Sequence, residues 1–137
     1  MKQTETYQLN LIENTDAFSP EPINANTRAI EGKLLELTGA AVKVAMGTYT
    51  GDGTLGASHP TTLTLEFQPK FLLVWGDSNY VMLGARGEQL RLNSGSTCTL
   101  LATTWEGGTV AWYNVYASGS EWQMNRANVT YRYLAIG

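Results

Sequence analysis

The sequence predicts a mainly β protein, in which one short helix precedes an antiparallel, jelly-roll-like β-sandwich. Thr, Val, Tyr and Trp are frequent and 14 glycines punctuate the chain, whereas good helix formers gather before residue 40. From Ala41 onward the apolar residues alternate with polar ones, which is the period of a strand. A chain of 137 residues has the size of one ordinary domain. We therefore expect a helical segment, 1–40, followed by a β domain, 41–137.

Eight segments of the second part have strand character and are separated by turn residues such as Gly, Asn, Asp and Ser. They are Val42–Thr50, Thr61–Glu66, Phe71–Trp75, Tyr80–Leu83, Gln89–Leu92, Thr97–Thr103, Thr109–Tyr116 and Asn128–Ile136. Because Phe71–Trp75 is apolar throughout, we expect a central strand with both faces covered.

The helix of the first part is predicted from about Pro22 to Leu37. Ser19 and two prolines form a start signal, and Gly39 is the expected C-terminal cap. Its apolar residues lie on one side of a helix: Ile23, Ile30, Leu34 and Leu37. A helix of this length is marginal alone in water, so this stripe must be covered. Either the chain's own β domain covers it, or the same stripe of other copies does so in a short coiled bundle.

Charge and hydropathy exclude several classes of protein. The net charge is −3 and no basic cluster is present, so nucleic-acid binding is not expected. No run of about 18 apolar residues predicts a membrane span, and the N-terminus lacks the features of a signal peptide. We therefore expect a soluble protein made in the cytoplasm. The single cysteine, Cys98, lies in a predicted strand and is expected to be a buried thiol.

Residues suited to catalysis are scarce, and we expect no enzymatic activity, no metal and no cofactor. His59 is the only histidine, and no Gly-x-Ser-x-Gly nucleophile motif is present. The loop Thr50–Thr54 lacks the alternating carboxylates of a calcium site and the Lys of a phosphate loop, so it is interpreted as a hairpin turn. A polysaccharide depolymerase with carboxylates paired across strands stays open as the enzymatic alternative.

Aromatic residues give the main indication of a binding surface, because their flat apolar rings stack on sugars or fill protein interfaces. Strand positions make Trp75, Trp112, Tyr131 and Tyr133 candidates for the core. Trp105 and Trp122 lie at or near loops and are the candidates for an exposed contact. Polar groups for a saccharide site are expected beside them from Asp77, Asn79, Tyr80 and Arg126.

Two parts of the chain resemble a known family. The run Thr4–Leu11 followed by Phe18–Glu31 resembles the start of tail-fibre and distal tail proteins from phages and prophages of Gram-positive bacteria. Gly47-Thr48-Tyr49-Thr50-Gly51-Asp52-Gly53, Leu65–Val74 and the terminal Tyr131-Arg132-Tyr133-Leu134-Ala135-Ile136-Gly137 are similar to small β domains at the tips of such fibres. Gln8 and Ile12 depart from the first pattern, and the coiled segment is short for a fibre shaft.

The resemblance implies a homotrimeric component of the virion tail that is made in the cytoplasm of the bacterial host. Its N-terminal segment would attach to other tail proteins, and its β domain would bind a host-surface saccharide or a neighbouring virion protein. The alternative is a monomeric carbohydrate-binding module whose helix folds onto its own sheet.

Overall fold

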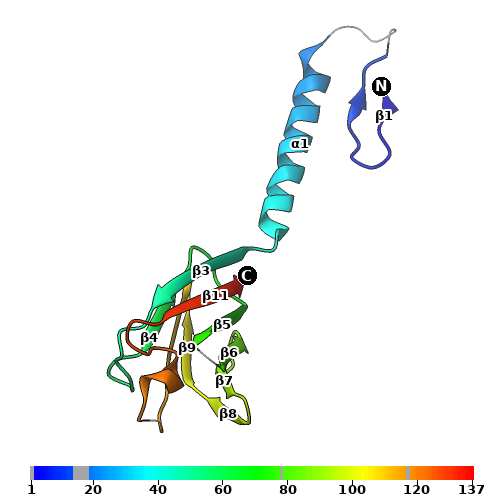
Figure 1. Cartoon of the computed structure of the whole chain (residues 1–137). Coiled ribbons are helices and arrows are strands. Elements are labelled where there is room, and N and C mark those ends of the chain that lie inside the picture. The colour runs from blue at the N-terminus through cyan, green and yellow to red at the C-terminus, as the bar shows by residue number, and fades with distance from the viewer. Residues whose placement is uncertain (1, 14–18, 78, 117) are drawn as a thin grey trace. The chain divides into compact units, whose positions relative to one another are not determined.

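A computed structural model of the chain describes residues 2–13, 19–77, 79–116 and 118–137. The chain divides into two compact units, Met1–Ala41 and Val42–Gly137, one residue beyond the predicted boundary (Figure 1). Each unit is described by itself. Strands predominate and all strand pairs are antiparallel, with one α-helix near the N-terminus, which confirms the predicted fold class.

The first unit combines a small hairpin with the helix. Strands β1 (Lys2–Gln3) and β2 (Asn10–Leu11) pair antiparallel, and helix α1 spans Pro20–Ala40. The Ser19 hydroxyl accepts a 3.3 Å hydrogen bond from the backbone N–H of Glu21 and so caps the helix as the sequence predicts. The predicted C-terminal cap is wrong: Gly39 lies inside the helix, which ends because Ala41 is extended.

One asparagine side chain ties the hairpin to the helix. Asn26 of α1 accepts a 2.6 Å hydrogen bond from the backbone N–H of Asn10 and donates a 2.9 Å bond to the carbonyl of the same residue. The side-chain amide of Asn26 thus pairs with both backbone polar groups of Asn10 in β2, as a neighbouring strand would. These hydrogen bonds join two residues that lie 16 positions apart in the sequence.

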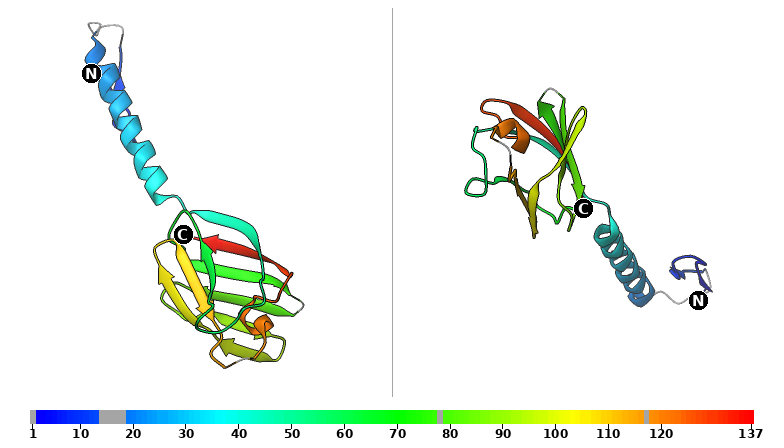
Figure 2. Two further views of the ribbon diagram at one scale, coloured as in Figure 1. Left: turned by 90° about the vertical axis from the view of Figure 1, so that its left-hand side faces the viewer. Right: turned by 90° about the horizontal axis from the view of Figure 1, so that it is seen from below.

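The second unit contains two antiparallel sheets that form a sandwich (Figure 2). The larger sheet has six strands in the order β3-β11-β5-β6-β7-β8, and the smaller has three in the order β4-β10-β9. The strands are β3 (Val44–Thr50), β4 (Thr61–Thr64), β5 (Phe71–Asp77), β6 (Tyr80–Ala85), β7 (Arg91–Ser94), β8 (Thr97–Leu100), β9 (Ala102–Glu106), β10 (Thr109–Tyr113) and β11 (Thr130–Ile136).

Every predicted strand is found, but one of them is divided. The predicted Thr97–Thr103 forms β8 of the larger sheet and β9 of the smaller one. The division falls at Leu101, which is buried and donates its backbone N–H to the carbonyl of Leu90 at 2.9 Å. Cys98 is exposed, so the prediction of a buried thiol is wrong.

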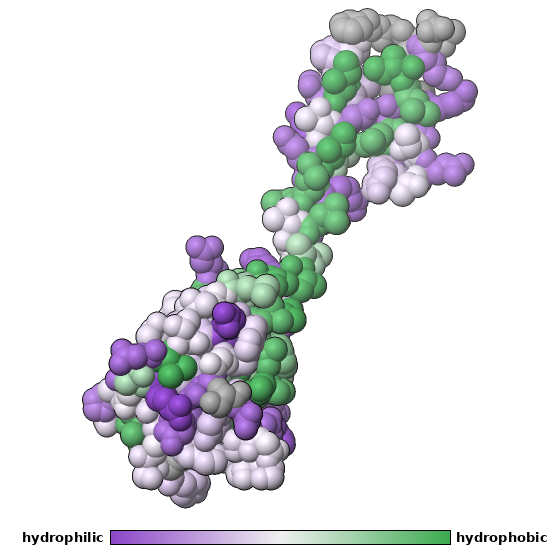
Figure 3. Space-filling view, viewed as in Figure 1, coloured by the Kyte–Doolittle hydropathy of each residue, from purple (hydrophilic) through white to green (hydrophobic). Residues whose placement is uncertain are grey.

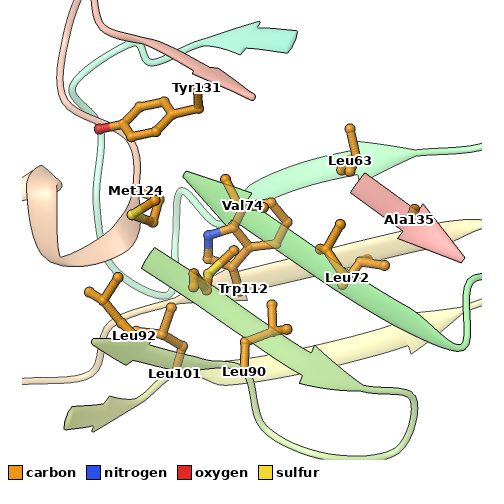
Figure 4. Close-up of a cluster of buried hydrophobic side chains, with 12 residues drawn as sticks. Leu63, Leu72, Val74, Leu90, Leu92, Leu101, Trp112, Met124, Tyr131 and Ala135 are labelled. Carbon is orange, nitrogen blue, oxygen red and sulfur yellow. The ribbon is translucent and has the colours of Figure 1, made fainter. Parts of the chain in front are cut away.

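The core lies between the two sheets and is centred on Trp112 (Figure 4). This side chain comes from β10 of the smaller sheet, and Leu72 and Val74 come from β5 of the larger one. All three are fully buried, and so is Tyr131 of β11. The Trp112 indole donates its N–H to the carbonyl of Gln123 at 2.9 Å, which satisfies its polar group inside the core.

The loop after β3 crosses from one sheet to the other, so the predicted hairpin turn at Thr50–Thr54 is wrong. Asn125 donates to the Asp52 carboxylate at 2.6 Å and to the Thr54 carbonyl at 2.9 Å. Gln123 accepts from the backbone N–H of Gly56 at 2.9 Å and donates to the His59 carbonyl at the same distance. Gln123 is the last residue of the 3₁₀ helix η1 (Ser120–Gln123), and Asn125 lies two residues after it. The buried side-chain amides of these two residues hold the crossing loop in place.

Candidate functional site

The helix carries the first candidate surface, because its apolar side chains are not covered. All residues of α1 are described, and none of them is buried. The predicted self-association residues Ile23, Ile30, Leu34 and Leu37 are 43%, 48%, 58% and 67% exposed. At 100° per residue they fall within an arc of about 60°, so they form one stripe along the helix. We call these four residues the helix stripe.

The N-terminal hairpin borders the helix stripe without closing it. A hollow of about 210 Å³ is lined by Tyr7 and Leu9 of the hairpin and by Ile30, Leu34 and Leu37 of the stripe. Tyr7 itself remains 60% exposed. The first unit therefore presents an apolar groove along a helix, a form that suits an apolar partner such as another helix.

The predicted saccharide residues divide into a buried group and a surface group. Asp77 is 4% exposed and lies 3.2 Å from the Arg126 guanidinium, and the Tyr131 hydroxyl donates to its second oxygen at 3.4 Å. Asp77 points inward because β5 bulges at Gly76. Glycine is favoured there because its φ is 137° and because a Cβ atom would lie only 2.7 Å from the carbonyl oxygen of Thr130. The Asp77 carboxylate is therefore engaged inside the single chain by Arg126 and Tyr131, and its role as a ligand contact stays a prediction.

Trp105 is also a poor contact, because it packs against the core. Its side chain is half-buried and its indole N–H donates to the carbonyl of Glu88 at 2.9 Å. The Arg126 side chain is 48% exposed but is directed to Asp77. Asn79 is exposed and lies in the turn directly before β6.

Trp122 and Tyr80 are brought together, and beside them lies a second candidate surface. Their rings meet edge to face with centroids 5.4 Å apart. Trp122 lines a shallow depression of about 300 Å³ whose other lining residues are Thr97, Thr99, Asn114, Tyr116 and Ser118. We call it the Trp122 depression. It offers the rings of Trp122 and Tyr116 together with threonine and serine hydroxyl groups, which is the chemistry that binds a sugar.

Sequence analysis missed most of the Trp122 depression. Tyr116 is 91% exposed, although strand periodicity placed it at the end of a strand. Asn114 accepts from the backbone N–H of Tyr116 at 2.9 Å and donates to the carbonyl of Trp122 at 3.1 Å, so it fixes both sides of the depression. The polar Asn114 directly after the apolar strand residues was the available signal that the strand ends before Tyr116.

Two tyrosines of the β domain, Tyr49 and Tyr131, have raised pKa values. Burial is the main cause that raises the pKa of Tyr131 to about 12, although a hydrogen bond from the Arg126 backbone N–H opposes the shift. Burial also raises the pKa of Tyr49, whose hydroxyl donates to the Met124 carbonyl at 2.7 Å. The two rings stack with centroids 5.1 Å apart. Both groups are neutral and structural at physiological pH.

The described parts of the chain hold no group of three or more His, Cys, Asp or Glu side chains that could bind a metal ion. Over the same residues, no helix has the length and apolar character required to cross a membrane. His59 lies in an exposed loop, where its ring contacts the Ser58 hydroxyl at 3.1 Å.

Comparison with known proteins gives no assignment: no family model, no curated protein and no solved structure matches the chain.

Proposed function

We propose that this chain is a non-enzymatic assembly and attachment component of a phage or prophage tail. In this proposal three copies associate through the helix stripe, the N-terminal segment contacts other tail proteins, and the β domain faces the host surface or a neighbouring virion protein. The protein would act in the virion after synthesis in the host cytoplasm. The observation that carries the proposal is the full-length exposure of the apolar side of α1.

The energetics of α1 favour a partner. Its 21 residues include Gly32 in the interior, where a glycine disfavours a helix by roughly 0.5–1 kcal/mol relative to alanine. A bundle that buried the helix stripe would gain roughly 1.5–3 kcal/mol for each fully buried side chain. Four such residues in each copy are sufficient to offset the weakness of the isolated helix.

The helix offers a matched pair of residues for the test. Leu34 belongs to the helix stripe, whereas Leu35 is 77% exposed on a different side of the same turn. The mass of the full chain should be measured by light scattering after size exclusion. We expect 45 kDa, three times the 15.0 kDa chain. Leu34→Glu should give the monomer mass, and Leu35→Glu should leave the trimer intact.

A monomeric wild-type chain would overturn the proposal. The same mass for both variants and the wild type would place the association outside the helix stripe and would remove its carrying observation. Circular dichroism of each variant should show an unchanged β signal, because neither residue belongs to the β domain.

A second function, carbohydrate binding by a single copy, is favoured by the Trp122 depression. Exposed Tyr116, the half-buried ring of Trp122 and two threonine hydroxyls suit one or two sugar rings. In the trimer the same depression would occur three times, so a weak saccharide contact would gain avidity. A monomer that still binds saccharide would support the free-standing module instead.

A further inference from the structure

The larger sheet presents apolar side chains to the outside as well as to the core. In the pairing of β3, β11, β5 and β6, one outward row runs straight across four strands. It consists of Met46, Leu134, Leu73 and Leu83. The next row contains Val44, Ile136 and Phe71, and the row on the other side contains Trp75 and Val81. We call these three rows the outer apolar face.

These side chains are accessible in the single chain. Met46 is 71% exposed, Val44 is 58% exposed and Val81 is 36% exposed, and the others are partly exposed. Figure 3 shows hydrophobic residues gathered along one side of the β domain. The prediction that both faces of β5 are covered is therefore not met within one chain: Leu72 and Val74 are buried, while Leu73 and Trp75 are only half-buried.

The smaller sheet shows what a water-facing surface looks like in the same domain. Its outward positions pair Thr62 with Ala111 and Thr104, and Thr64 with Thr109 and Glu106. The row Thr64, Thr109 and Glu106 is wholly polar, while the inward Leu63, Val110 and Trp112 are buried, as is usual for an antiparallel sheet with one solvated face. The larger sheet departs from that pattern over four adjacent strands, which indicates a surface that is covered in the working state.

The size of the outer apolar face suits a shared interface. Strands are about 4.8 Å apart and same-face residues about 6.7 Å apart, so nine residues span roughly 290 Å² in projection. The 21 residues of α1 form a cylinder about 32 Å long, and a strip about 10 Å wide adds roughly 320 Å². Each surface alone is below the roughly 800 Å² that each partner buries in a standard interface, and together they approach it.

Chain connectivity links the two surfaces to one partner. Helix α1 ends at Ala40, and the backbone N–H of Lys43 already donates to the Gly137 carbonyl of the β domain at 2.9 Å. Only residues 41 and 42 lie between the end of α1 and Lys43, so the connection spans at most about 11 Å when it is fully extended. Helices packed side by side have axes about 8–10 Å apart. Copies joined through α1 therefore hold their β3 strands at high effective concentration.

We propose that the outer apolar face packs against a second copy of this chain. The proposal rests on the self-association proposed above and names a second contact within it. The nine named residues of the outer apolar face are all uncharged. Arg132 of β11 lies beside Trp75 in the third row, and Arg91 of β7 follows Leu83 at the end of the first row. An apolar surface of this kind is complementary to another copy of itself or to the helix stripe of the neighbouring copy.

Thiol accessibility tests this contact in the full chain. The exposed Cys98 is first replaced by serine, so that an introduced cysteine is the only thiol. Met46→Cys reports on the outer apolar face, and Thr62→Cys, exposed on the smaller sheet, is the matched control. In the oligomer we expect a maleimide to label Met46→Cys at least about tenfold more slowly than Thr62→Cys, because rate follows access of the reagent. Adding Leu34→Glu should make the two rates equal.

Each outcome decides the proposal. Equal labelling rates in a chain with the trimer mass overturn this contact and leave self-association through the helix stripe intact. A monomeric chain overturns both. Protection of Met46→Cys that survives in the Leu34→Glu monomer assigns the cover to the chain's own N-terminal unit and likewise overturns a second copy as the occupant.

Discussion

The side-chain amide of Gln123 donates a 2.9 Å hydrogen bond to the backbone carbonyl of His59, which lies 64 residues earlier in the chain. The same amide donates to the Thr61 hydroxyl at 3.1 Å, and its oxygen accepts from the backbone N–H of Gly56. Gln123 is fully buried. One side chain thus satisfies the polar groups of the loop that carries the chain from the larger sheet to the smaller one.

Replacing Gln123 with leucine should destabilise the β domain. The change keeps much of the volume but leaves several buried backbone groups without their partner, and each unsatisfied group costs about 1–3 kcal/mol. We expect a loss of about 3 kcal/mol in the free energy of unfolding, measured by urea denaturation. Gln89→Leu, at an exposed position, is the control and should change the midpoint little. Similar midpoints for both variants would show that the Gln123 bonds contribute no stability.

Acid should loosen the crossing loop through Asp52. Hydrogen bonds from the Thr54 hydroxyl and backbone N–H, and then from Asn125, lower the pKa of the Asp52 carboxyl. A carboxyl whose pKa is lowered by folding adds stability above its unfolded pKa of about 4 and loses it as the pH falls through the lower folded value. We expect the urea midpoint to fall less between about pH 5.5 and pH 3 in Asp52→Asn than in the wild type.

Thr54→Val gives an independent check on this cause. This variant removes the Thr54 hydroxyl that donates to Asp52 and leaves the Asp52 carboxylate in place. It should therefore weaken in part the pH dependence of the urea midpoint. If Asp52→Asn and the wild type lose stability in parallel over that range, the hydrogen bonds to Asp52 are not its source.

Strong alkali should unfold the end of the sandwich that contains Tyr131. The pKa of this phenol is about 12 in the folded chain, against about 10 when it is unfolded. The folded state then holds a proton that the unfolded state releases, so this stability is complete below about pH 10 and is lost as the pH rises toward 12. Tyr131→Phe should unfold with a smaller pH dependence in that range, as followed by phenolate absorbance and circular dichroism. An unchanged dependence would assign the effect to other tyrosines.

The fold could be predicted because its signals are local. Alternation of apolar and polar residues, or a continuous apolar run in β5, marked the strands of the β domain, and Ser19 with its prolines marked the start of α1. The short strands β1 and β2 were not predicted. The break at Leu101 was missed. Leu100, Leu101 and Ala102 interrupt the alternation there, but the change of sheet is shown only by the strand order and by the contact with Leu90. Gly39 was expected to end the helix, yet the extended Ala41 does so.

The candidate surfaces were less predictable, because side-chain direction depends on distant partners. Asp77 follows a glycine and looked like an exposed turn residue, but the bulge at Gly76 directs it to Arg126, 49 residues away. Cys98 faces outward because it pairs with the outward Asn93. By contrast, the helix stripe was readable from its spacing alone, since helical period fixes which residues share a side.

Removal of the exposed Tyr116 ring should weaken saccharide binding by the Trp122 depression. Tyr116→Ala is the cleaner variant, because Tyr116 is 91% exposed whereas Trp122 also packs against Tyr80 and the core. Loss of an aromatic stacking partner should weaken binding by about tenfold or more. Val115→Ala, at a neighbouring exposed position outside the depression, is the matched control and should bind like the wild type. Binding to a panel of Gram-positive cell-wall polysaccharides is the measurement, with release of reducing ends followed in the same samples. Equal binding by Tyr116→Ala and wild type would move the contact elsewhere on the β domain, and reducing ends that accumulate with time would replace adhesion by hydrolysis.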